Sequence, residues 1–134
     1  MMIKPQTDRT KLLNILALCA YCTYIYWLSA QTSLKPPIDF GILYQDKLYH
    51  ASAYFIMGVL AWRCFRCFTA RTMTLALISI AFCSVYGATD EWHQSFVSGR
   101  SSDAMDWLAD TIGASLATFF LSQPRISVNK NAWH

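Results

Sequence analysis

Carboxylates and imidazoles are concentrated in one part of this chain. The stretch Thr89–Asp110, TDEWHQSFVSGRSSDAMDWLAD, holds five of the eight acidic residues. A carboxylate beside an imidazole can act as a general base with a proton shuttle. We therefore consider Glu91, Asp90, His50 and His93 as candidate catalytic residues.

The same residue types can also bind ligands. Zinc is chemically compatible with His50, His93 and two carboxylates, but nothing in their spacing favours a metal, so we predict no metal ligand and no cofactor. The planar guanidinium of Arg100 suits a carboxylate or a phosphate. The residues predicted to form a binding site are Asp46, His50, Tyr54, Asp90, Glu91, Gln94, Arg100, Asp103, Asp106 and Asp110.

Composition indicates the setting in which these residues lie. The 134-residue chain is 54% hydrophobic and 14% charged, against about 25% charged in soluble domains. Four apolar segments, 12–30, 48–68, 72–89 and 104–122, approach the roughly 20 residues that cross a bilayer. Their runs lack the alternation of barrel strands, so helices must satisfy the backbone in lipid. The sequence predicts an all-α, four-helix transmembrane bundle that forms a single domain over 1–134.

Basic residues predict the orientation of this bundle, because cytoplasmic loops are enriched in Lys and Arg. One set of helix ends is flanked by Lys4, Arg9, Lys11, Arg63, Arg66, Arg71, Arg125 and Lys130. The opposite set has Lys35, Lys47 and Arg100. Both termini are therefore expected in the cytoplasm, and loops 31–47 and 90–102 are expected to face outward.

Helical spacing predicts where the polar side chains point. Asp103, Asp106 and Asp110 share one helix face with Gly113 and Ala117, and small residues allow close helix contact in a bilayer. This face is expected to point into the bundle.

Carboxylates inside a membrane protein need partners. Arg100, Lys47, His50 and His93 are the candidates, with Arg100 expected to bridge Asp103 or Asp106. Asp103 is expected to cap the last helix, and Asp46 to cap the second.

These residues carry a resemblance to a known family. The chain resembles the VanZ-like membrane proteins over roughly 12–121. The resemblance rests on YWLSAQTS (Tyr26–Ser33), DKLYHASAYFIMG (Asp46–Gly58) and YGATDEWHQSFVSGRSSDAMDWLADTIGA (Tyr86–Ala114). One departure is Asp110, where most members are expected to have Asn. The resemblance implies four membrane helices and an association with low-level resistance to glycopeptide antibiotics, teicoplanin in particular. It implies no established reaction.

Two functions from different classes follow from this interpretation. The first is a non-enzymatic protein of the bacterial cytoplasmic membrane, whose outward polar pocket binds a lipid head group or a lipid-linked cell-wall precursor. The alternative is a membrane-embedded hydrolase or transferase that acts on a lipid or glycan at the outer leaflet. A proton relay through Asp106, Asp110 and His50 is disfavoured, because the cytoplasmic half of the bundle has no matching polar residues.

Partners are predicted only in part. The lipid bilayer is the expected surrounding. The net charge of +3 is small and scattered, so no nucleic acid is expected. The sequence gives no oligomeric state.

Overall fold

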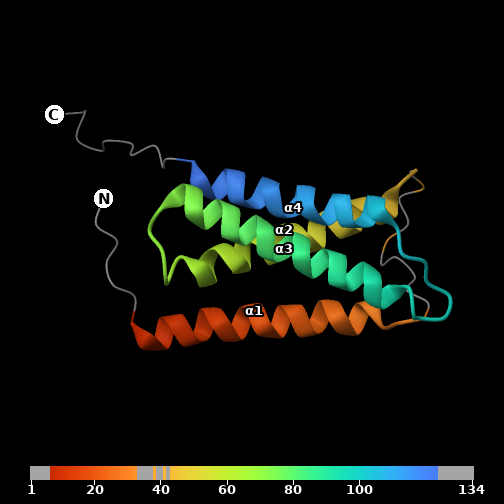
Figure 1. Cartoon of the computed structure of the whole chain (residues 1–134), viewed down its shortest axis with the longest axis horizontal. Coiled ribbons are helices and arrows are strands. Elements are labelled where there is room, and N and C mark those ends of the chain that lie inside the picture. The colour runs from red at the N-terminus through yellow and green to blue at the C-terminus, as the bar shows by residue number, and fades with distance from the viewer. Residues whose placement is uncertain (1–6, 33–37, 39–40, 42, 124–134) are drawn as a thin grey trace.

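The computed structural model describes residues 7–32, 38, 41 and 43–123. This part of the chain forms four helices, which are α1 (Asp8–Ser29), α2 (Gln45–Phe65), α3 (Thr72–Gln94) and α4 (Ala104–Ser122), with no strand. The predicted all-α class with four helices is confirmed. The helices alternate in direction along one bundle (Figure 1). We call the end where α1 and α3 finish, and where α2 and α4 begin, the polar end.

Two helices extend further toward the polar end than the apolar segments predicted. Helix α2 begins at Gln45 rather than Leu48, and α3 continues to Gln94 rather than Thr89. Hydropathy finds the part of a helix that suits lipid, whereas the backbone hydrogen bonds continue into polar residues. Asp46, Asp90 and Glu91 are therefore helical residues with fixed directions.

Helices α1 and α3 are long and apolar enough to cross a membrane, with mean hydropathies of 1.5 and 1.6. Helices α2 and α4 do not meet the same criterion within the described residues. Large apolar side chains nevertheless cover the outside of the whole bundle, and Trp27, Val85 and Phe120 are each more than half exposed. An apolar surface of this extent is typical of a protein that lies in lipid.

Small residues bring α2 and α4 into the closest contact of the bundle. A Cβ atom built on Gly113 would lie 2.0 Å from the backbone oxygen of Ala51. A Cβ on Gly58 would lie 3.1 Å from atoms of Ala114 and Ala117. The predicted small-residue face of α4 is therefore buried against α2, as the spacing indicated.

The interior of the bundle combines this small-residue contact with a few larger side chains. Its buried hydrophobic cluster consists of Leu18, Ile25, Tyr54, Met57, Ala61, Cys64, Cys83 and Ala114. Two tyrosines attach α1 to the other helices: Tyr21 donates to the backbone oxygen of Ala53 over 2.9 Å, and Tyr86 donates to that of Cys22 over 2.6 Å.

The contact at Gly113 leads to a stability prediction. Alanine favours a helix over glycine by about 1 kcal/mol, but overpacking a close contact costs about 1–3 kcal/mol. Since the clash is with backbone, we expect Gly113→Ala to lower the Tm of the protein in detergent micelles. The neighbouring variant Ile112→Ala removes a side chain that is 48% exposed, and should change the Tm little. An unchanged or higher Tm for Gly113→Ala would contradict this packing.

Candidate functional site

Lys47 is the main cation among the carboxylates at the polar end. Its ammonium Nζ lies 2.9 Å from Asp46 Oδ2, 2.5 Å from Asp103 Oδ2 and 2.6 Å from Asp106 Oδ1. Lys47 is on the first turn of α2, whereas two of its partners lie at the start of α4. The ion pairs therefore join the two helices where the carboxylates are most crowded.

These ion pairs shift the pKa values of Lys47, Asp46 and Asp103. Burial acts to lower the pKa of Lys47, but hydrogen bonds to Asp103, Asp106 and Asp46 outweigh it and raise that pKa. The ammonium of Lys47 in turn holds the pKa of Asp46 and Asp103 below the usual range of a carboxyl group. Lys47, Asp46 and Asp103 are therefore charged near neutral pH.

His50 connects the ion pairs to a deeper carboxylate. Its Nδ1 lies 3.0 Å from Asp110 Oδ1, and its Nε2 lies 3.7 Å from Asp106 Oδ2. Asp110 is fully buried. Tyr54, one turn further along α2, is 1% exposed, and its hydroxyl has no hydrogen-bond partner. The burial of Asp106 and Asp110 agrees with the inward direction predicted for their helix face.

Glu91 reaches the same place from α3. Its Oε2 accepts a hydrogen bond of 2.8 Å from the backbone N–H of Asp103, which explains how an acid is held at the end of α3. Gly87, one turn earlier, lets α3 approach α4, because a Cβ there would lie 3.0 Å from Asp110 Oδ2. We call Asp46, Lys47, His50, Glu91, Asp103, Asp106 and Asp110 the carboxylate cluster.

Asp90 belongs to a second group of hydrogen-bonded side chains, which includes Gln94 and Arg100. Its Oδ2 accepts a hydrogen bond of 3.2 Å from Gln94, whose Oε1 accepts one of 2.8 Å from Arg100. The expected bridge from Arg100 to Asp103 or Asp106 is absent among the described residues, where Lys47 makes these ion pairs instead. Lys47, on the first turn of α2, lies next to the start of α4 and reaches Asp103 and Asp106. Arg100 instead donates to Gln94 at the end of α3.

A cavity of about 320 Å³ lies between α1 and α3 at the polar end. We call it the α1–α3 cavity, and it is lined by Tyr26, Tyr86, Thr89, Asp90, Trp92 and His93. The ring of His93 stacks on Tyr26 with centroids 4.6 Å apart. His93 is therefore grouped with Asp90 and apart from the cluster that contains His50.

The structure corrects the predicted cap of α2 and adds residues to the predicted site. Tyr44, with a positive φ of 63°, takes the N-cap position of α2 without a side-chain hydrogen bond, so Asp46 is no cap. Asp103 does cap α4, accepting from the N–H of Met105. Lys47 was predicted as a partner but omitted from the binding residues.

The aromatic residues of the cavity were missed altogether. Tyr26, Tyr86 and Trp92 lie near helix ends, where aromatic side chains collect in membrane proteins. This position in the sequence was the signal that could have identified them as candidate site residues. Sequence spacing alone does not place α1 against α3, so it cannot show that these side chains share a cavity.

The comparisons with known proteins identify the family of the chain. The family model described as VanZ/LLP1 matches residues 5–125, nearly the whole chain. The chain therefore belongs to the VanZ/LLP1 family. Family membership and the two apolar helices α1 and α3 indicate a membrane protein linked to resistance. No curated protein and no solved structure matches the chain.

The ion pairs of Lys47 lead to a second stability prediction. Lys47→Met removes the cation from three carboxylates, and we expect the Tm in detergent micelles to fall by about 5 °C or more. Lys11→Met is the matched control, since Lys11 pairs only with the fully exposed side chain of Asp8 at 3.3 Å. Exposed ion pairs contribute little. Equal shifts in the two variants would contradict the special role of Lys47.

The lowered pKa values predict how this difference depends on pH. A carboxyl whose folded pKa is below the unfolded value of about 4 contributes stability above that value. This contribution is lost as the pH falls through the folded pKa. We expect the Tm difference between wild type and Lys47→Met to be complete near neutral pH and to shrink below about pH 4. A difference that stays constant in thermal melts over this range would contradict the pairing of Lys47 with Asp46 and Asp103.

Proposed function

We propose that this chain is a multi-pass protein of the bacterial cytoplasmic membrane that binds the head group of a cell-envelope lipid at its outward polar end. In this proposal all four helices cross the bilayer and both termini are cytoplasmic. The α1–α3 cavity is the observation that carries it. A cavity of about 320 Å³ is within the range of about 300–1,000 Å³ typical of small-ligand sites.

The lining of the cavity suits an amphipathic head group. Tyr26, Tyr86 and Trp92 offer aromatic surface, while Thr89 and Asp90 offer polar groups. The Nε2 atom of His93 is buried and has no hydrogen-bond partner. Buried polar atoms are normally hydrogen-bonded, so a ligand hydroxyl would complete this site.

Charge favours the hydroxyl-rich part of a head group over a bare phosphate inside the cavity. Asp90, an acidic group additional to those of the carboxylate cluster, lines it directly. Lys47 is already paired with three carboxylates, so it offers little attraction to an anion. The half-buried Arg100 is the cation left to face a phosphate at the rim.

A lipid-linked cell-wall precursor has this combination of a sugar and a phosphate on a lipid. We propose this class of molecule as the ligand. A protein that holds such a precursor at the outer surface would compete with a glycopeptide antibiotic for it. This competition is how the proposal accounts for a link to teicoplanin-type resistance.

The orientation in this proposal can be tested separately. Green fluorescent protein fused after His134 should fluoresce in intact bacteria, because this reporter folds in the cytoplasm and fails when exported through the general secretion route. The matched control inserts the same reporter in the loop between α3 and α4, within residues 95–102, where we expect no fluorescence. The opposite pattern would overturn the proposed direction of the bundle.

Lipid binding is tested with Tyr26→Ala and a matched neighbour. Protein in phosphatidylglycerol nanodiscs doped with a polyprenyl-diphosphate-linked disaccharide is analysed by native mass spectrometry. Tyr26→Ala removes the ring that stacks on His93, and we expect at least about a tenfold weaker retention, equivalent to about 1.4 kcal/mol.

Tyr24→Ala is the control for this measurement. Tyr24 and Tyr26 are 49% and 54% exposed on the same helix, but the ring of Tyr24 contacts Tyr21 and Trp27 outside the cavity. Wild-type protein that retains no doped lipid, or equal loss in both tyrosine variants, would reject the cavity as the binding site.

A further inference from the structure

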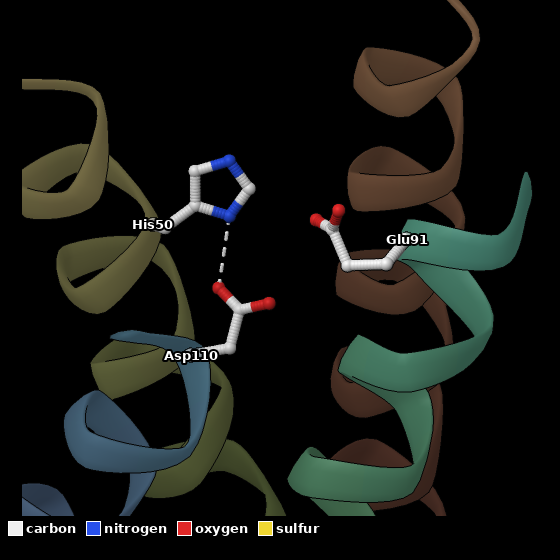
Figure 2. Close-up of side chains that lie close together, drawn as sticks. All are labelled: His50, Glu91 and Asp110. Carbon is white, nitrogen blue, oxygen red and sulfur yellow. Dashed lines mark hydrogen bonds and ion pairs between the residues drawn. The ribbon is translucent and has the colours of Figure 1, made fainter. Parts of the chain in front are cut away.

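Three side chains from three helices converge inside the carboxylate cluster. His50 of α2, Glu91 of α3 and Asp110 of α4 each offer one ligand atom, and these atoms all lie within 4.8 Å of one another. Figure 2 shows the carboxylate of Glu91 and the ring of His50 facing each other above the carboxylate of Asp110. Within the described residues, this is the one group of histidine, cysteine and acidic side chains that meets so closely.

Two oxygens of this group lack a protein partner. Glu91 is 5% exposed and Asp110 is 0% exposed. Glu91 Oε1 and Asp110 Oδ2 are both buried without a hydrogen bond. An unpartnered oxygen of a buried carboxylate costs several kcal/mol. Both oxygens are therefore available to a bound group.

The cations present do not supply that group. Lys47 Nζ is occupied by Asp46, Asp103 and Asp106. Arg100 donates to Gln94 and lies on the other side of α3. His50 contacts Asp110 Oδ1 through Nδ1, which leaves Glu91 Oε1 and Asp110 Oδ2 without a hydrogen bond.

We propose that His50, Glu91 and Asp110 bind one divalent transition-metal ion, with zinc as the best match. An imidazole nitrogen with carboxylate oxygens suits zinc and its neighbours, whereas calcium and magnesium prefer oxygen alone. Three protein ligands leave a fourth position open, as in zinc sites that exchange a water for another ligand.

The distances fit such an ion with little movement. Ligands about 2.0–2.1 Å from a tetrahedral metal lie about 3.3 Å apart, and His50 Nδ1 is 3.0 Å from Asp110 Oδ1. The metal would take the lone pair of Nδ1 and leave the ring proton on Nε2. Movement of Glu91 toward this pair would close the remaining gap.

The groups around the three ligands are also of the kind that orient metal ligands. The Nε2 atom of His50 faces Asp106 at 3.7 Å. Glu91 Oε2 is held by the backbone N–H of Asp103 over 2.8 Å, so Oε1 remains for the metal. Gly87 leaves space beside Asp110 Oδ2, where a Cβ would come within 3.0 Å.

Cobalt(II) is the probe for the test, because its spectrum reports the ligand type. The whole protein, purified with a tag that lacks histidine, is depleted of metal with a chelator and titrated with cobalt in nanodiscs. We expect one ion per chain and a spectrum without a thiolate charge-transfer band. That band would indicate binding by the five cysteines and would overturn the assignment.

The variants keep the shape of the ligands wherever possible. Asp110→Asn and Glu91→Gln preserve volume and should each weaken cobalt binding at least about tenfold, as should His50→Ala. The two isosteric variants keep the test valid if His50→Ala fails to fold. Undiminished affinity in Asp110→Asn and Glu91→Gln, or wild-type protein that binds no cobalt, would overturn the proposal.

His93→Ala is the matched control, because His93 stacks on Tyr26 at a distance from this group. Its cobalt affinity should equal that of wild type, and a loss would overturn the ligand set. The inference does not depend on lipid binding. Cobalt binding that persists in Tyr26→Ala, with lipid retention lost, would separate the metal site from the α1–α3 cavity.

Discussion

Charge neutralisation within an apolar bundle is the constraint on which this structure depends. Carboxylates below the mouth of a membrane bundle cannot rely on water, so each must find a partner within reach of its helix. Lys47 meets this requirement for Asp103 and Asp106 and thereby joins α2 to α4. Glu91 and Asp110 make no ion pair with Lys47, so these two carboxylates remain able to bind another cation.

Backbone contact makes this arrangement possible. Gly113 allows α2 and α4 to touch below the ion pairs, and Gly87 allows α3 to approach Asp110 from the other side. Larger side chains at either position would separate the helices and move the carboxylates away from their partners. Of the helix pairs that contact one another, α1 and α3 have the least contact, which leaves space for the α1–α3 cavity.

The helices and their inward faces were predictable, but the grouping of the polar residues was only partly so. Periodicity placed Asp106 and Asp110 inside the bundle, and hydropathy located α4 to the residue. The partners of these acids depended on how far α2 and α3 continue as helices beyond their apolar parts. One extra turn of α3 sends Asp90 toward α1 and Glu91 toward α4, although the two are adjacent in sequence. That division follows from helix packing, which the sequence pattern does not specify.

The α1–α3 cavity and the proposed metal site have different consequences for whether this protein only binds a ligand or also catalyses a reaction. A cavity with aromatic walls can hold a head group, but holding it does not require the buried trio of His50, Glu91 and Asp110. A metal with one open position can bridge to a ligand oxygen, or it can activate water. Asp110 is fully buried and His50 is 18% exposed, so access to the metal would be through the side of His50 and Asp106. A ligand that reaches the metal from there would pass the ion pairs of Lys47, on a route separate from the α1–α3 cavity.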